Sequence, residues 1–403
     1  MKISMRASAA AAGLTALLTV VSLAGCGTAS SGAGPTSTAT STATGGQSAA
    51  STTPAASTPA ATGTATASPA SIPAGGPVPS GFAATSVTFV STDEAFVLGT
   101  APCSATPCTS IVRTLNRGAT WVGLPAPVVP LSTSDNGSGQ PAVWGIRFAD
   151  PAHGFVFGNG LWETTDGGEH WTAVASPGGS ITDLEVIDGQ VLAVSSNDAL
   201  YRRPLAGGSW SLVTHVTNPT VIATQAQVAA VLDGSKVIVT GNGGLTITTE
   251  NTPCSTLGVA EPSSVAVTGP DSLALLCAGG AAMGSVQKTV YVSDDLGVQW
   301  SKAGSPPNGG DPGGLSAGTP GQLVVAAESG ASELYYSADG GVQWSTAWYA
   351  GDGGMGFNDL GFTTTNDGVV VRGPAMNDGN GEGRPGQLLL TSNGGATWQT
   401  VTW

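Results

Sequence analysis

The feature that most constrains the fold of this chain is a repeated turn sequence. The decamer YVSDDLGVQW (291–300) returns almost unchanged as YYSADGGVQW (335–344), and both contain the pattern Ser/Thr-x-Asp/Asn-x-Gly-x-x-Trp. Good copies of this box occur at 114–121, 164–171, 293–300, 337–344 and 391–398, with a degenerate copy at 203–210. Because the step from Trp210 to Trp300 is twice the usual spacing, we expect a further unit near 248–255 that has lost the box.

A second series, made of short apolar runs, predicts the same number of units. The runs lie about 45 residues apart on average, and they begin at Phe96, Phe155, Val191, Val237, Leu273, Leu323 and Val369. Each is preceded by one strand candidate and followed by a third strand, the box and a fourth strand. Four short strands in each of seven units predict an all-β protein, a seven-bladed β-propeller of four-stranded blades over residues 79–403.

The residue types of the box account for its recurrence. In a turn between the third and fourth strands, an Asp or Asn side chain can accept backbone N–H groups, and Gly tolerates positive φ. Trp buries a large apolar area against the neighbouring blade. We therefore expect a structural role for the box residues Asn116, Trp121, Asp166, Trp171, Asp295, Trp300, Asp339, Trp344, Asn393 and Trp398.

The box resembles the Asp-box, or bacterial neuraminidase repeat. That repeat is seen in sialidases, sortilin-type receptors, some xyloglucan hydrolases and photosystem II assembly-factor propellers. The resemblance extends over residues 79–403 and implies a propeller. It does not select one activity among those families.

The N-terminal region has a different composition. Lys2 and Arg6 precede a small, apolar run that is too short for a convincing membrane span and ends in LAGC (23–26), which resembles the lipobox of bacterial lipoproteins. The resemblance implies a signal peptide over 1–26 and a lipid anchor at Cys26, on the extracytoplasmic face of the bacterial cell membrane. The alternative is an ordinary secretory peptide that contains a Cys.

A tether follows the anchor. Residues 27–78 consist almost entirely of Gly, Ser, Thr, Ala and Pro, which cannot bury enough apolar area to fold. We expect a disordered linker with a reach of roughly 40 Å.

The net charge excludes one class of partner. All 26 acidic residues lie at or beyond Asp93, and 10 of the 12 basic residues lie beyond residue 79, which leaves a surplus of 16 negative charges there. Binding to a phosphate backbone needs a basic surface, so we expect no nucleic acid partner.

The connections between strands predict where a partner binds. Boxed turns and first-to-second strand turns share one face of a propeller, and the long insertions fall on the other, where functional loops concentrate. The binding candidates on this insertion face are Trp144, Arg147, Trp162, Trp348, Tyr349, Arg372 and Arg384. The alternative is that most of these aromatic side chains pack under their own loops.

The remaining cysteines favour disulfides because the chain is expected to be exported. Proximity favours the pairs Cys103–Cys108 and Cys254–Cys277, which is one of three connectivities. A metal site lacks ligands at suitable spacing. The stretch 378–383 imitates the start of a calcium loop, but Leu389 occupies the position of its bidentate Glu. We expect no metal and no cofactor.

A catalytic function finds little support. Sialidases carry an Arg-Ile-Pro motif that is missing here, and Arg147, Arg372 and Arg384 would be the only arginine clamp. A glycosidase needs two carboxylates beside a cleft, and Asp135, Asp311, Asp352 and Asp359 cannot be paired from the sequence.

We therefore expect a non-catalytic, membrane-anchored scaffold that binds an envelope protein or peptide. The alternatives are a glycan-binding protein or a sialidase-like glycoside hydrolase acting on extracellular carbohydrate, and a structural role at the envelope without a tight ligand.

Overall fold

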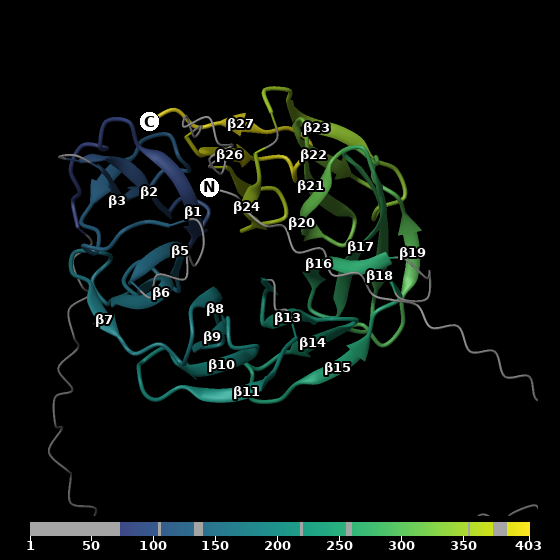
Figure 1. Ribbon diagram of the computed structural model, residues 1–403, viewed down its shortest axis with the longest axis horizontal. Helices are drawn as coiled ribbons and strands as arrows, with labels where there is room; N and C mark the ends of the chain where they lie inside the picture. The colour runs from purple at the N-terminus through teal and green to yellow at the C-terminus, as the bar shows by residue number, and fades with distance from the viewer. Residues whose placement is uncertain are drawn as a thin grey trace, which may run out of the picture. The chain divides into compact units, whose positions relative to one another are not determined.

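The computed structural model describes residues 73–103, 106–132, 140–217, 221–254, 260–353, 355–373 and 385–403. These residues form seven antiparallel blades around a central axis, and the architecture is the predicted seven-bladed β-propeller (Figure 1). Within the described ranges, no helical segment has the length and apolar character needed to cross a bilayer.

Each blade is built from strands that are consecutive in the chain. Blade 1 comprises β1 (Ala83–Phe89), β2 (Ala95–Cys103), β3 (Thr106–Thr114) and β4 (Val122–Leu124). Blade 2 comprises β5 (Ala142–Phe148), β6 (Gly154–Thr164) and β7 (Thr172–Val174). Blade 3 comprises β8 (Ile181–Ile187), β9 (Gln190–Ser195), β10 (Ala199–Pro204) and β11 (Ser211–His215). Blades 4 and 5 comprise β12 (Ile222–Gln225), β13 (Val228–Asp233), β14 (Lys236–Thr240) and β15 (Thr248–Asn251); and β16 (Ala260–Gly269), β17 (Ser272–Ala282), β18 (Ser285–Ser293) and β19 (Ser301–Gly304). Blades 6 and 7 comprise β20 (Asp311–Thr319), β21 (Gln322–Glu328), β22 (Ser332–Ser337) and β23 (Ser345–Ala350); and β24 (Phe357–Phe362), β25 (Gly368–Arg372), β26 (Gln387–Thr391) and β27 (Gln399–Thr400).

Blade 2 has three named strands because β6 carries two of the four. Its residues 154–159 pair with β5, whereas residues 161–163 pair with β7. Gly160 lies between these two parts at φ 144°, a conformation that favours glycine. The segment therefore supplies both the second and the third strand of this blade.

Blade 4 corrects one expectation from the sequence. Its box is TGNGGLTI at 240–247, before the stretch 248–255 where we placed the lost unit, and Ile247 stands where the other boxes have Trp. Consequently Val237 lies in the third strand of its blade, not the second. The Thr, Asn and Gly of the box are present in blade 4. A sequence pattern that requires Trp at the last position does not match this turn.

The boxed turns share one hydrogen-bond pattern. In blade 6, Ser337 Oγ donates to Asp339 Oδ1 (2.8 Å) and accepts the N–H of Gly341 (2.8 Å), which has φ 94°. Asp339 Oδ1 also accepts the N–H of Gln343 (2.9 Å). The same three bonds recur in the boxes of blades 1, 2, 4, 5 and 7. The turn thus satisfies its own buried N–H groups through two side chains.

The boxed turns of blades 1, 2, 5, 6 and 7 also contact the first-to-second strand turn of their own blade. Gly340 N–H donates to the carbonyl of Gly321 in blade 6 (3.0 Å), and Gly394 N–H donates to that of Asn366 in blade 7 (2.9 Å). Both kinds of turn therefore lie on one face, which we call the boxed face. The opposite face, which carries the second-to-third strand turns and the connections between blades, is the insertion face.

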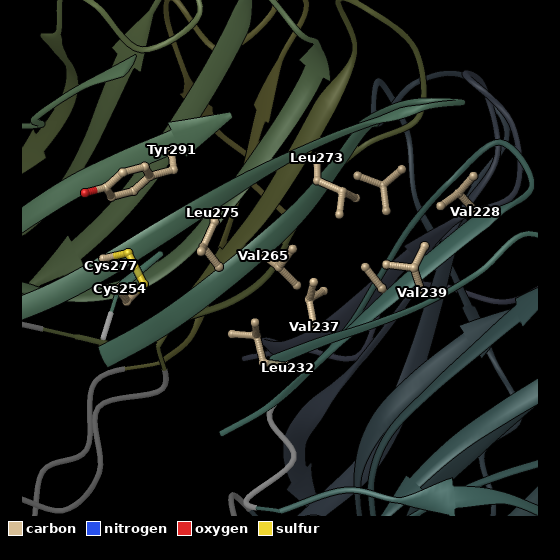
Figure 2. Close-up of a cluster of buried hydrophobic side chains, with 12 residues drawn as sticks. Val228, Leu232, Val237, Val239, Cys254, Val265, Leu273, Leu275, Cys277 and Tyr291 are labelled. Carbon is tan, nitrogen blue, oxygen red and sulfur yellow. A yellow bond between two sulfur atoms is a disulfide. The ribbon is translucent and has the colours of Figure 1, made fainter. Parts of the chain in front are cut away.

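The core consists of seven clusters, one between each pair of neighbouring blades. Figure 2 shows the cluster between blades 4 and 5, in which Val237 and Val239 face Val265 and Leu273. The box Trp belongs to these clusters, as the buried Trp398 does between blades 6 and 7. Apolar sheet faces of this kind are stable only when another sheet covers them, so the ring stabilises every blade.

The ring closes between blade 7 and blade 1 without a strand exchanged between them, as far as the described strands extend. Val87 and Val97 of blade 1 pack with Val369 and Leu388 of blade 7. The seam also has a backbone hydrogen bond from Ala84 N–H to the carbonyl of Gly386 (3.2 Å).

Residues 73–79, which we call the N-terminal strap, lie along the outer strand of blade 1. Gly76 and Gly123 exchange two backbone hydrogen bonds of 2.8 Å each, and Arg113 donates to the carbonyl of Pro73. The sequence assigns residues up to 78 to the linker. The structure places their last few residues against the propeller because two glycines allow close backbone pairing.

Cys254 and Cys277 form a disulfide that joins the end of blade 4 to the second strand of blade 5, the pairing favoured by proximity. Cys103 is also disulfide-bonded. The side chain of Cys108, its expected partner, lies outside the described residues, as do Cys26 and the stretch 378–383.

Candidate functional site

A cavity of about 780 Å³ occupies the centre of the ring. It is lined by the first strand of every blade, β1, β5, β8, β12, β16, β20 and β24. Its volume lies within the range of small-molecule and cofactor pockets, roughly 300–1,000 Å³. Near the insertion face its wall includes Val221, Gly353, Met355 and Gly373.

Arg147 on β5 forms the centre of a charged cluster inside this cavity. Its guanidinium is paired with Glu185 (2.6 Å), Asp359 (2.7 Å) and Asp183 (3.3 Å). The side chain of Arg147 is 12% exposed, and those of Asp183 and Asp359 are 7% and 14% exposed. Because the interior weakens screening, these pairs interact far more strongly than surface pairs do.

Two carboxylates of the cluster also connect blades, because each accepts a hydrogen bond from a backbone N–H of a neighbouring blade. Asp359 Oδ2 accepts the N–H of Val87 (2.9 Å), across the seam between blades 7 and 1. Asp183 Oδ2 accepts the N–H of Ile222 (2.8 Å), from blade 3 to blade 4. With Arg147 in blade 2, the cluster links five consecutive blades.

Asp359 adopts an unusual backbone conformation, with φ 52° beside a β-bulge in β24. A non-glycine residue in the left-handed region costs about 1–2 kcal/mol. The bonds of its carboxylate to Val87 N–H and Arg147 offset this cost and hold the side chain toward the cavity.

Glu185 is held differently from the other two carboxylates. Its Oε1 accepts from Arg147 Nε, and among the described residues its Oε2 has no hydrogen-bond partner. Its side chain is 21% exposed. Burial raises the pKa of Glu185 to about 7, and Arg147 opposes that rise.

The cavity has more acidic than basic groups in its wall. Arg147 is the one basic residue among the described lining residues, against the carboxylates of Asp183, Glu185, Glu328 and Asp359. Burial raises the pKa of Asp183 and, at the insertion-face end, of Glu328. The wall therefore favours an additional positive charge.

Apolar groups stand beside these carboxylates. Trp144 and Phe157 line the cavity next to Arg147, whose guanidinium carbon lies 5.9 Å from the centre of the Phe157 ring. Val221, at the start of β12, is 47% exposed. The site places the half-buried ring of Trp144 beside the charged cluster and the exposed Val221 at its insertion-face end, an arrangement suited to an amphipathic ligand.

The structure brings together only two of the predicted binding residues, Trp144 and Arg147, in the cavity. Trp162 packs in the core between blades 1 and 2. Trp348 lies between blades 6 and 7 under the guanidinium of Arg372, at 5.4 Å from its ring centre.

The other three predicted binding residues lie outside the cavity or outside the described residues. Arg372 is buried and paired with Asp352. Tyr349 is 61% exposed on the outer strand of blade 6, where Glu333 is its strand partner, and it does not line the cavity. Arg384 lies outside the described residues.

Sequence reasoning missed Asp183 and Glu185 and left Asp359 without a partner. A usable signal was present in the strand sequence ITDLEVI (181–187), where acidic residues stand at alternate positions of a first strand. Side chains at i and i+2 share one face of a strand. Since first strands line the channel of a propeller, that face points to the cavity.

No family model and no curated protein matches the sequence. Among solved structures, the chain is similar to YCF48 bound to a D1 peptide, with 18% identity over 78% of this chain and 95% of that chain and a TM-score of 0.55. It is also similar to YCF48 from Cyanidioschyzon merolae, with 14% identity, 79% and 97% coverage and a TM-score of 0.53. A GH74 xyloglucanase from Xanthomonas campestris shares 12% identity over 79% of this chain and 72% of that chain, with a TM-score of 0.39. At such identities, the likeness to the two YCF48 structures shows that this chain shares their fold.

Proposed function

We propose that this protein is a non-catalytic scaffold of the bacterial cell envelope, anchored by a lipid at Cys26, that binds a peptide or an extended segment of a partner protein in the central cavity. The peptide enters from the insertion face. The linker holds the propeller away from the membrane surface, so the cavity remains accessible.

The cavity is the observation that carries this proposal. It has the volume of a binding pocket, and its insertion-face end is bordered by Gly353, Gly373 and the exposed Val221. A shared fold alone does not imply a shared function, but the peptide named with one YCF48 structure supports the choice of ligand class.

Selection of peptides from a random display library on the full chain, purified in detergent, tests the proposal. Gly314 lines the cavity, and a Cβ added there meets no atom within 4 Å. Gly314→Phe should therefore fill part of the cavity without disturbing the fold. Gly241, on the boxed face, is equally open and gives the matched control Gly241→Phe.

We expect the selected peptides to bind wild type and Gly241→Phe equally and to lose at least tenfold in affinity for Gly314→Phe. A selection that yields no binding peptide, or peptides that bind all three proteins alike, contradicts the proposal.

The anchor has its own test. Growth with an alkyne-labelled fatty acid should label the wild-type chain in cells and leave Cys26→Ser unlabelled. Equal labelling of both would exclude Cys26 as the attachment point.

A glycoside hydrolase is the second candidate, favoured by one observation. The pKa of Glu185 is raised by burial to about 7 beside two further carboxylates, as in a general acid that works next to an ionised partner. A panel of chromogenic glycosides tests this. Turnover that Glu185→Gln abolishes would establish catalysis and displace the scaffold proposal.

A further inference from the structure

We propose that the central cavity selects a positively charged side chain, lysine or arginine, of the bound peptide, which enters beside Trp144 and ends at the carboxylate of Glu185. This inference rests on the proposed function, because it specifies the ligand of the same cavity.

The first argument is the distribution of hydrogen bonds in the cluster. Asp183 and Asp359 each accept a backbone N–H from a neighbouring blade in addition to Arg147, so their oxygens connect the ring. Glu185 accepts only from Arg147, and its second oxygen has no partner within the described residues. A carboxylate oxygen that is mostly buried but still reachable is expected to bind a donor, and a charged donor most strongly.

The second argument is charge. One guanidinium cannot balance the carboxylates of the cluster, and no other basic side chain lines the cavity among the residues that the structure describes. An ammonium or guanidinium group from the ligand would reduce the surplus negative charge. The acidic surplus of the whole propeller acts in the same direction, because it attracts a basic partner and repels an acidic one.

The third argument is the shape of the approach. Lysine and arginine carry their charge at the end of a flexible apolar stem. The half-buried ring of Trp144 lines the wall on the same strand as Arg147 and provides apolar surface for that stem, whereas Phe157 is 2% exposed and packs between blades 2 and 3. A divalent metal ion would gain nothing from the Trp144 ring, whereas a basic side chain uses both parts of the site.

Protonation of Glu185 should control the binding. The charged groups that face it are Arg147 from β5, Asp183 from its own strand and Asp359 from β24. Since Glu185 binds a cation in its ionised form and its pKa is about 7, affinity should rise about tenfold between pH 6 and pH 8. Asp183, whose pKa is also raised by burial, changes affinity in the same direction.

The experiment uses peptides obtained by selection on the full chain and sensitive to Gly314→Phe. Each basic residue of such a peptide is replaced in turn by norleucine, and affinity is measured by fluorescence anisotropy at pH 6 and pH 8. We expect one position to lose about 10- to 100-fold on replacement, as for loss of a charged hydrogen bond. Exchange of Lys and Arg at that position shows which cation the cavity prefers.

The protein variants give the reciprocal test. Glu185→Gln should weaken the unmodified peptide by at least tenfold at pH 8 and reduce the pH dependence to the part that Asp183 contributes. The amide oxygen can still accept from Arg147, so the fold should be retained, and thermal unfolding checks this. Glu261→Gln removes the same charge from an exposed residue near the start of β16 and should change affinity less than twofold.

The outcomes separate the two proposals. Two results overturn this inference and leave the proposed scaffold function standing. In the first, the peptides that lose affinity for Gly314→Phe contain no basic residue. In the second, they contain basic residues but keep their affinity when norleucine replaces each of them. If Glu185→Gln and Glu261→Gln behave alike, Glu185 is not the recognition group and the inference is wrong. If no peptide depends on Gly314, the proposed function fails and this inference fails with it.

Discussion

The boxed turns and the central cavity differ in how their residues are distributed among the blades. Six of the seven blades form the same turn with the same three hydrogen bonds, on different residues. In the cavity one contact recurs, in which a first-strand side chain accepts a backbone N–H from the first strand of the next blade; it is made by Ser86, Asp183, Ser264 and Asp359. Arg147, by contrast, is the one basic side chain among the described lining residues, and it is paired with Glu185. Contacts that recur among the blades stabilise the blades and the ring, whereas the pair of Arg147 and Glu185 gives the cavity its distinct chemistry.

The weakest repeats support this distinction. Blade 4 keeps its turn although Ile247 replaces Trp, and the Cys254–Cys277 disulfide joins this blade to the next. Blade 3 has Arg203 at the first box position, where it pairs with Glu163 of blade 2. A blade can therefore lack individual box residues when another contact with a neighbouring blade replaces the lost stabilisation.

The largest effect is expected from a box Trp. Trp398 is 7% exposed and packs with Val324, Phe357 and Val370 between blades 6 and 7. Trp398→Ala should reduce the free energy of unfolding by about 3–5 kcal/mol, measured by urea denaturation. Tyr349→Ala, at an exposed aromatic residue of blade 6, is the control and should change it by less than about 0.5 kcal/mol. Similar losses for both would contradict a structural role specific to the box.

The disulfide between blades 4 and 5 comes next. It closes a loop of sequence separation 23. The double variant Cys254→Ala/Cys277→Ala should lose about 3 kcal/mol, on the chain-entropy account of cross-links. Peptide affinity should not change, because neither residue lines the cavity. A loss of binding in a folded double variant would show that the two regions are coupled.

A smaller effect is expected from a box hydroxyl. Ser337 is 1% exposed, and its oxygen accepts the buried N–H of Gly341. Ser337→Ala leaves that N–H without a partner and should cost about 1–3 kcal/mol, measured by chemical denaturation. Ser337→Thr keeps the hydroxyl and serves as the control. Equal costs for both substitutions would mean that packing, not the hydrogen bond, matters here.

The smallest effect on the free energy of unfolding at neutral pH is expected from Glu185→Gln in the cavity. The size of this effect should depend on pH. The pKa of Glu185 is about 7 in the folded protein because of burial, whereas the unfolded chain has the ordinary glutamate pKa of 4.5. Between these values the folded state binds more protons, so stability should fall as pH rises. Glu185→Gln should flatten this fall. The measurement is the thermal unfolding temperature of both proteins between pH 5 and pH 7. If it falls with pH equally in wild type and in Glu185→Gln, Glu185 is not held protonated in the folded state.

The sequence was sufficient for the architecture and only partly for the cavity. Repeated boxes and apolar runs predict seven blades because each blade has to satisfy the same local and packing requirements. The cluster around Arg147 depends on residues 212 positions apart that meet across the ring, and no repeat signals such a meeting. Trp348 and Arg372 were predicted as binding residues, and the structure places them against each other between blades 6 and 7.

A comparison of two exposed residues of blade 4 tests the central claim most directly. Val221 lies at the insertion-face end of the cavity and is 47% exposed, and Leu245 lies in the boxed turn and is 58% exposed. A photo-crosslinking amino acid is placed at one or the other position of the full chain in living cells. We predict a crosslinked protein partner from position 221, reduced by a selected cavity peptide, and none from position 245. Crosslinking from position 245 alone would contradict the account, because it would place the partner on the face that we assign to structure.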